Sequence, residues 1–168
     1  MHNKGGFIEI GGSYLYFPVI YDHTTVIGAS FPASMDRISN LMPSPKLRPI
    51  LYAGDKASVF LLAMQYRVIN GLDPYNEFAV MIPVTFDSEK GESGPPAYYA
   101  VYTPVTTYPA LELGVKGYGY PKFPATISFL DTDESCRCQV QIDDSNIITL
   151  EVEKVEVSEK NPTYIIIQ

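Results

Sequence analysis

The chain has 168 residues, of which 46% are hydrophobic, and a formal charge of −7 at neutral pH. This negative charge argues against nucleic acid as a partner, because phosphate contacts require clustered Lys and Arg side chains. No apolar run approaches the roughly 18 residues that span a bilayer, and the first residues lack the apolar core of a secretory signal, so we expect a cytoplasmic protein with no membrane partner.

The proline and glycine content favours a mainly β fold. Fourteen prolines and twelve glycines are scattered along the chain and divide it into short segments, which is typical of an all-β domain rather than a helical bundle. The first segments predict a hairpin, with strands at Phe7–Ile10 and Ser13–Tyr21 joined by a Gly-Gly turn. No internal repeat or long linker is present, so residues 1–168 are expected to form a single domain.

One clear helix is predicted after this hairpin. Ser30 can cap it and Pro32 is tolerated in its first turn. Pro43 and Pro45 would stop it. Its apolar positions form one stripe at helical spacing: Met35, Ile38, Leu41 and Met42.

A series of strands is predicted downstream of that helix, separated by segments rich in turn-forming residues. They are Pro49–Ala53, Ala57–Val68, Glu77–Phe86, Ala97–Val105, Ala125–Leu130, Ser135–Ile142, Asn146–Val157 and Thr163–Gln168. The continuously apolar runs within them indicate strands buried on both faces. A short helix is expected over Pro109–Lys116, ended by Gly117. Together these elements favour a closed antiparallel β-barrel or cone with one or two short helices.

The two cysteines do not predict a disulfide or a metal site. Cys136 and Cys138 would share one face of a strand, too close in sequence for an easy disulfide. The only histidines, His2 and His23, lie far upstream, so a metal site would lack ligands. We expect both thiols to be reduced and no metal to be bound.

Lys122 is the candidate nucleophile. It lies among aromatic and proline residues in the segment GVKGYGYPKFPATISF, residues 114–129. Apolar surroundings disfavour the ammonium form of a lysine, and a neutral amine can attack a ketone to form an iminium that accepts electrons from a breaking carbon bond. The local context leaves a second interpretation open, in which the lysine stem packs on tyrosines and its ammonium stays in water. No nucleophile elbow, P-loop or dinucleotide motif is present.

The tripeptide Tyr120-Pro121-Lys122 resembles the catalytic segment of the acetoacetate decarboxylase family, in which a Tyr-Pro-Lys sequence carries the Schiff-base lysine. Upstream, YNEFAVMIPVTF resembles the family's strand with an active-site glutamate, which is Glu77 here. The preceding MDRISNLMPSP and VFLLAM, and the later NPTYIII, resemble family segments in the same order. The resemblance runs from about Tyr14 to the end of the chain.

The resemblance implies a lyase that acts on a β-keto acid or related carbonyl compound, without a cofactor. Lys122 would form the imine, and Glu77 would orient the substrate or relay a proton. Tyr120, Phe123 and Lys116 are the residues expected to line the substrate pocket with them. Activation of a lysine in acetoacetate decarboxylase by desolvation or a cationic neighbour is an established example.

Several polar positions of the family differ here. The second lysine of the family is Phe123, whose apolar ring is expected to replace part of the missing charge by desolvation. The family's Arg-Glu pair reads Val115-Lys116, a second glutamate falls near Leu61, and an early arginine falls near Tyr14. These differences leave two alternatives open: a Schiff-base aldolase or dehydratase acting on a keto acid, and a non-catalytic small-molecule-binding protein of the same fold.

The chain is expected to be C-terminally short relative to the family. It stops within the apolar run Thr163–Gln168, and an unpaired terminal strand of this kind requires cover from another strand or chain. Together with the family resemblance, this run predicts a homo-oligomer, which light scattering would test; a monomer would contradict it.

Overall fold

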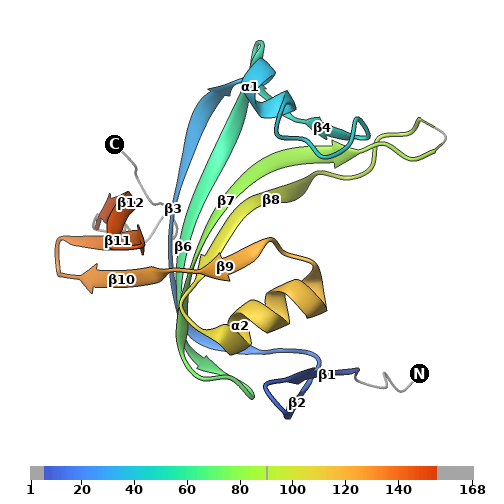
Figure 1. Cartoon of the computed structure of the whole chain (residues 1–168). Helices are drawn as coiled ribbons and strands as arrows, with labels where there is room; N and C mark the ends of the chain where they lie inside the picture. Colours follow the sequence, from blue (N-terminus) through green and yellow to red (C-terminus); the bar gives the residue numbers. More distant parts are fainter. Residues whose placement is uncertain (1–5, 90, 155–168) are drawn as a thin grey trace, which may run out of the picture.

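The computed structural model describes residues 6–89 and 91–154, which form three sheets and short helical segments (Figure 1). The strands are β1 (Phe7–Ile10), β2 (Ser13–Tyr16), β3 (Tyr21–Ser34), β4 (Leu47–Pro49), β5 (Leu51–Ala53), β6 (Lys56–Ile69), β7 (Tyr75–Phe86), β8 (Ala97–Val105), β9 (Lys122–Pro124), β10 (Thr126–Asp131), β11 (Ser135–Ile142) and β12 (Ser145–Glu153). The helices are α1 (Met35–Ser39) and α2 (Tyr108–Glu112), and α2 continues into a π-helical turn, η1 (Leu113–Tyr118). The prediction of a mainly β protein with short helices is confirmed.

The prediction of a closed barrel or cone is wrong for the described residues. The large sheet has the order β3-β6-β7-β8-β9, with β4 added to β7 and β5 added to β6, and its outer strands β3 and β9 do not pair with each other. After β9 the chain leaves this sheet and forms the separate sheet β10-β11-β12, which crosses one face of it instead of closing it (Figure 1). The apolar strands are therefore buried by stacking of two open sheets.

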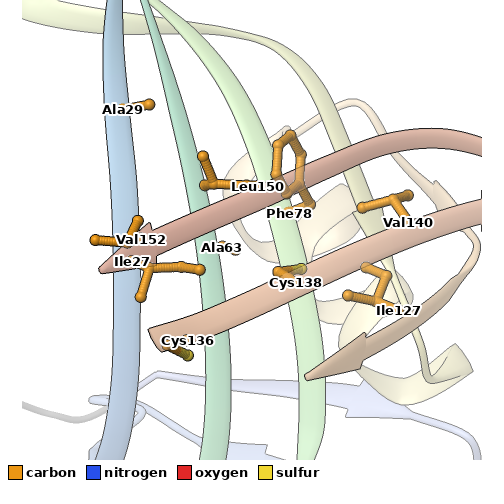
Figure 2. Packing of buried hydrophobic residues seen from close by; sticks show 10 residues of the cluster. All are labelled: Ile27, Ala29, Ala63, Phe78, Ile127, Cys136, Cys138, Val140, Leu150 and Val152. Carbon is orange, nitrogen blue, oxygen red and sulfur yellow. The ribbon is translucent and has the colours of Figure 1, made fainter. Parts of the chain in front are cut away.

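The main core lies between these two sheets. Figure 2 shows its buried side chains: Ile27, Ala29, Ala63, Phe78, Ile127, Cys136, Cys138, Val140, Leu150 and Val152. Both cysteines of β11 are buried free thiols, and they lie on one face of the strand as the alternation predicted. Burial raises the pKa of the Cys138 thiol to about 12.

The α2–η1 segment lies over part of the opposite face of the large sheet, so the first half of β7 has covering elements on both sides. Its side chains alternate: Phe78 enters the core against β10–β12, whereas Glu77 and Ala79 face a cavity beneath η1. This double covering explains the continuous apolar runs in β6 and β7. It also places Glu77 among the mostly apolar and aromatic side chains that line this cavity.

The predicted helix that starts at Ser30 is wrong. The segment up to Ser34 belongs to β3, and only Met35–Ser39 is helical. Proline is compatible with this position because, among the described strands, β3 pairs with β6 alone and forms an edge of the large sheet, where a missing N–H is tolerated. The apolar stripe still has a packing role, since Ile38 is buried against Ala57 and Ile82.

Other boundaries shift at prolines and glycines. The predicted strand Ser13–Tyr21 is interrupted between β2 and β3, and Pro49–Ala53 is divided between β4 and β5. The second helix ends at Gly119, where φ is 71°, rather than at Gly117. Ala97–Val105 and Ser135–Ile142 have the predicted bounds. Thr163–Gln168 lies outside the described residues, and no helix in the described part is long and apolar enough to span a membrane.

Candidate active site

Lys122 and Glu77 form a buried ion pair. Lys122 on β9 lies beside Thr103 on β8, and Glu77 lies one strand further, on β7. The lysine side chain therefore crosses β8, and its Nζ atom lies 2.7 Å from Glu77 Oε2. The Lys122 and Glu77 side chains are only 5% and 10% exposed. Sheet pairing thus joins two residues that are far apart in sequence.

The pair lies at a cavity of about 250 Å³ between the large sheet and η1. Its wall is mostly apolar, with methionine, alanine and leucine side chains, and it also contains tyrosines from several elements: Tyr21, Tyr66, Tyr75, Tyr118 and Tyr120. Among the described residues that line it, Glu77 and Lys122 are the only charged ones. A mostly apolar concave site with a few convergent polar groups is typical of small-molecule sites.

Burial changes the proton affinity of Glu77. Removal of the carboxylate from water raises its pKa above the ordinary value, and the neighbouring Lys122 ammonium offsets only part of this effect. Burial of two charged groups in an apolar wall costs more desolvation free energy than burial of the corresponding neutral groups. A glutamate in this environment therefore binds a proton more readily than one in water.

Tyr66 and Tyr75 are neutral groups in the wall of the cavity. Burial raises the pKa of Tyr66 and of Tyr75, so both stay protonated. The Tyr75 hydroxyl donates to the Tyr21 hydroxyl at 3.3 Å. The Tyr75 ring also lies below the Lys122 ammonium, with 5.6 Å between Nζ and the ring centroid, which is within the range of a cation–π contact.

The α2–η1 segment forms the roof of the cavity and leads directly into β9. Leu113 in η1 is 1% exposed and fixes this segment in the fold. After Gly119 adopts its left-handed conformation, the Tyr120 N–H donates to the Gly114 carbonyl at 2.9 Å. The chain then enters β9 with Lys122 directed back under the turn that precedes it.

The other predicted pocket residues lie in different places. Tyr120 lines the cavity and is 45% exposed. Phe123 follows Lys122 on β9 and faces the opposite side, where its ring packs edge-on against Tyr102 at 5.5 Å. Lys116 pairs with Glu112 and is 54% exposed, and it does not line the cavity. Phe123 therefore does not desolvate the lysine as the sequence interpretation required.

Sequence reasoning missed several cavity residues. Tyr75 could have been found by strand alternation, because it lies two positions before Glu77 on β7. The position of Tyr21 and Tyr66 in the cavity wall depends on how β3 pairs with β6, and the sequence carries no local signal for this pairing. Thr103 was also missed; it is 3% exposed, and its hydroxyl has no hydrogen-bond partner among the described residues. Within residues 6–89 and 91–154, no three His, Cys, Asp or Glu side chains gather as a metal site would require.

Comparison with protein families gives a match to the model described as acetoacetate decarboxylase, over residues 11–163. No curated protein sequence matches the chain. Among solved structures, an acetoacetate decarboxylase from Legionella pneumophila is similar with a TM-score of 0.68 and 14% identity, over 81% of this chain and 50% of the other. A second acetoacetate decarboxylase structure has a TM-score of 0.69 and 19% identity, over 80% and 50% of the two chains.

A third similar structure is the enduracididine biosynthesis enzyme MppR in complex with pyruvate. It has a TM-score of 0.60 and 16% identity, over 83% of this chain and 58% of the other. At these identities the likeness shows a shared fold. The chain spans about half the length of these solved structures.

Proposed function

The chain belongs to the acetoacetate decarboxylase family, and from this premise we propose that it is a lyase that acts on a β-keto acid or related carbonyl compound through a Schiff base on Lys122. The observation that carries the proposal is the buried Lys122–Glu77 pair at the cavity, with 2.7 Å between Nζ and Oε2. A buried lysine beside a proton acceptor is the arrangement that imine chemistry requires.

The first step is formation of the imine. Proton transfer from the Lys122 ammonium to Glu77 leaves a neutral amine and a neutral carboxylic acid. The amine nitrogen attacks the carbonyl carbon, and one proton of the nitrogen moves to the oxygen to give a carbinolamine. Glu77 then gives its proton to this hydroxyl, which leaves as water, and the iminium cation remains beside the Glu77 carboxylate. The raised pKa of Glu77 supports this role as proton carrier.

The second step breaks a carbon–carbon bond. For a β-keto acid, the electron pair of the bond to the carboxylate moves toward the iminium nitrogen, so carbon dioxide leaves and a neutral enamine forms. The charge of the carboxylate disappears in this step, and the mostly apolar wall favours that loss of charge. Protonation of the enamine carbon and hydrolysis by water release the ketone and restore Lys122.

Condensation or dehydration on a keto acid remains the second candidate. Formation of the iminium is identical. The iminium then loses a proton from the adjacent carbon to give an enamine, which attacks an aldehyde or expels a hydroxyl that is protonated and leaves as water, and no carbon dioxide is released. The presence of a single lysine among the described residues of the cavity wall favours this alternative, because different substrates need different charge partners. One similar structure contains MppR with the condensation product of pyruvate and imidazole 4-carboxaldehyde. A protein that binds such compounds without turnover is the third candidate.

Borohydride trapping tests the proposal. The protein is incubated with acetoacetate, pyruvate or a neutral ketone, reduced with borohydride and analysed by intact mass and peptide mapping. We expect a reduced adduct on Lys122 that is lost in Lys122→Ala, while Lys56→Ala, which alters an exposed lysine at the start of β6, traps as well as the parent protein.

The reaction type follows from the product. Release of carbon dioxide from acetoacetate supports decarboxylation, whereas an adduct with pyruvate and no carbon dioxide supports condensation or dehydration. A folded protein that forms no adduct with any of these compounds would contradict both enzymatic candidates and leave the binding protein.

A further inference from the structure

We infer that Gly114 is a positioning residue for Lys122, because the absence of a side chain at this position is what allows the lysine to reach Glu77. The catalytic meaning of this inference rests on the proposed function. Its steric basis does not, because it concerns only how the two residues pack.

The lysine stem occupies the space that a side chain at residue 114 would need. A Cβ atom built on Gly114 would overlap Cδ and Cε of Lys122 and would lie 2.9 Å from its Cγ. Non-bonded carbon atoms do not approach this closely. The overlap involves three successive carbons of the stem, so rotation of the terminal ammonium alone would not relieve it.

The stem has little freedom to move aside. Its ammonium is held at 2.7 Å from Glu77, and the whole side chain is 5% exposed. On the sheet side it passes over β8, where Thr103 is 3% exposed and Val105 is fully buried. On the other side lies η1, anchored by buried Leu113. A side chain at residue 114 would therefore have to push the lysine off Glu77 or lift η1 from the sheet.

Backbone conformation does not explain the glycine. Gly114 lies in the turn of η1 with φ outside the left-handed region, unlike Gly119 at φ 71°. Any residue can adopt such a conformation, and alanine is favoured over glycine in a helical turn. The close approach of Lys122 is thus the steric reason for a glycine here.

The same turn supplies a matched control. Gly117 also lies in η1 with φ outside the left-handed region, and a Cβ there would meet only the ends of side chains: Leu113 Cδ1 at 3.2 Å, Phe17 Cζ at 3.5 Å and Ile8 Cδ1 at 3.7 Å. Gly114→Ala and Gly117→Ala therefore make the same chemical change in the same helical turn, and they differ in whether the new methyl meets the lysine stem.

The first test measures the rate of borohydride-trapped adduct formation with acetoacetate and with pyruvate. We expect Gly114→Ala to slow it roughly a hundredfold, since a displacement of about 1 Å can cost that much, and Gly117→Ala to leave it within about twofold. Equal rates for Gly114→Ala and the parent protein would overturn the inference, provided that the parent forms an adduct.

The second test is a double-mutant cycle in thermal stability, which needs no substrate. Gly114→Ala should lower the melting temperature by roughly 5 °C in the parent protein, because overpacking of a filled space is destabilising. In a Lys122→Ala background the stem is gone, so Gly114→Ala should lower the melting temperature little or raise it. Glu77 lacks its lysine partner both in Lys122→Ala and in the double variant, so its effect on the melting temperature cancels when these two proteins are compared.

The two tests separate the possible failures. No adduct with the parent protein would overturn the proposed function, while a coupling between residues 114 and 122 in the cycle would still support the packing role of Gly114. An equal loss of stability from Gly114→Ala with and without Lys122 would overturn the inference itself, whatever the outcome of trapping.

Discussion

The surroundings of Glu77 favour its protonated form more than water does, and this has a consequence for stability. Because burial raises its pKa in the folded protein from the ordinary value of 4.5, the folded state keeps a proton on Glu77 at pH values where the unfolded chain has lost it. Stability contributed by this group is therefore fully present below the unfolded pKa and is lost as the pH rises through the folded pKa.

Glu77→Gln tests whether the stability that Glu77 contributes falls as the pH rises. The free energy of unfolding of the parent protein minus that of Glu77→Gln should fall as the pH rises from about 4.5, because the variant has no proton to lose at this position. Denaturant unfolding of both proteins from pH 4 to pH 7 measures it, and titrating groups that do not contact Glu77 cancel in the difference. A difference that stays flat or rises with pH would contradict the assignment.

Residues of the site were predictable to different degrees. Lys122 and Glu77 were indicated by the resemblance of their segments to a family, and the structure places their charged atoms in contact. Phe123 was expected beside the lysine, but neighbouring residues on a strand point to opposite faces. Strand alternation was available in the sequence and would have separated them. The contribution of Gly114 depends on the path of the lysine stem, which no local pattern encodes.

One carboxylate of α2 makes a polar contact with the β1–β2 hairpin, whose Ile10 and Leu15 side chains also pack against Leu113. Glu112 is buried, and its Oε2 accepts a hydrogen bond from the Gly11 N–H at 3.0 Å in the hairpin turn, while its Oε1 is paired with Lys116. These contacts lower the pKa of Glu112, with the Lys116 hydrogen bond as the largest cause. Glu112 therefore links the α2–η1 segment to the turn of the β1–β2 hairpin.

Glu112→Ala should loosen the hairpin without unfolding the sheets. We expect backbone amides of β1 and β2 to exchange hydrogen at least about tenfold faster, since local opening depends on few contacts, with β6 and β7 unchanged. Lys116→Ala serves as the matched variant, because it removes the ion pair and keeps the bond to Gly11, so its effect should be smaller. Hydrogen exchange read by mass spectrometry measures both, and uniform exchange rates across the variants would contradict this role.

Elements with strong alternation or long apolar runs were predicted well, whereas prolines misled the assignment. Ser30 and Pro32 looked like the start of a helix, but they lie on β3, which is an edge of the large sheet as far as the described residues go, and proline is tolerated on such a strand. Residues 22–29 were not recognised as a strand because one side of β3 is exposed and its sequence is polar at the start. The π-helical turn has no sequence signal of its own.

At the scale of the whole molecule, the large sheet separates two environments. One face holds the hydrophobic core against β10–β12, and the other faces the cavity with Glu77 and Lys122. The expected closed barrel failed because sequence patterns reveal which strands are buried but not whether the covering comes from closure or from a second sheet. The predicted homo-oligomer depends on Thr163–Gln168, outside the described residues, and stays a prediction that light scattering can decide.

This separation predicts that stability and chemistry can be changed independently. Leu150→Ala in β12 removes a side chain that is 5% exposed in the core, and it should destabilise the fold by about 2–5 kcal/mol. Trapping at Lys122 should persist at temperatures where the variant is folded. Ile147→Ala, on the same strand but 57% exposed, should change stability by less than about 0.5 kcal/mol. Thermal unfolding and trapping of both variants provide the measurement, and loss of trapping in folded Leu150→Ala would contradict the separation.

The opposite orientation of Lys122 and Phe123 on β9 makes the site sensitive to changes of chain length. A strand repeats every two residues, so insertion or deletion of a single residue between η1 and β9 that shifts the strand register would exchange the two faces. The phenylalanine ring would enter the cavity and the ammonium would meet the apolar side near Tyr102. Single-residue length variation in this connection is therefore expected to be far more damaging than substitution, whereas a two-residue change preserves which side chain points inward.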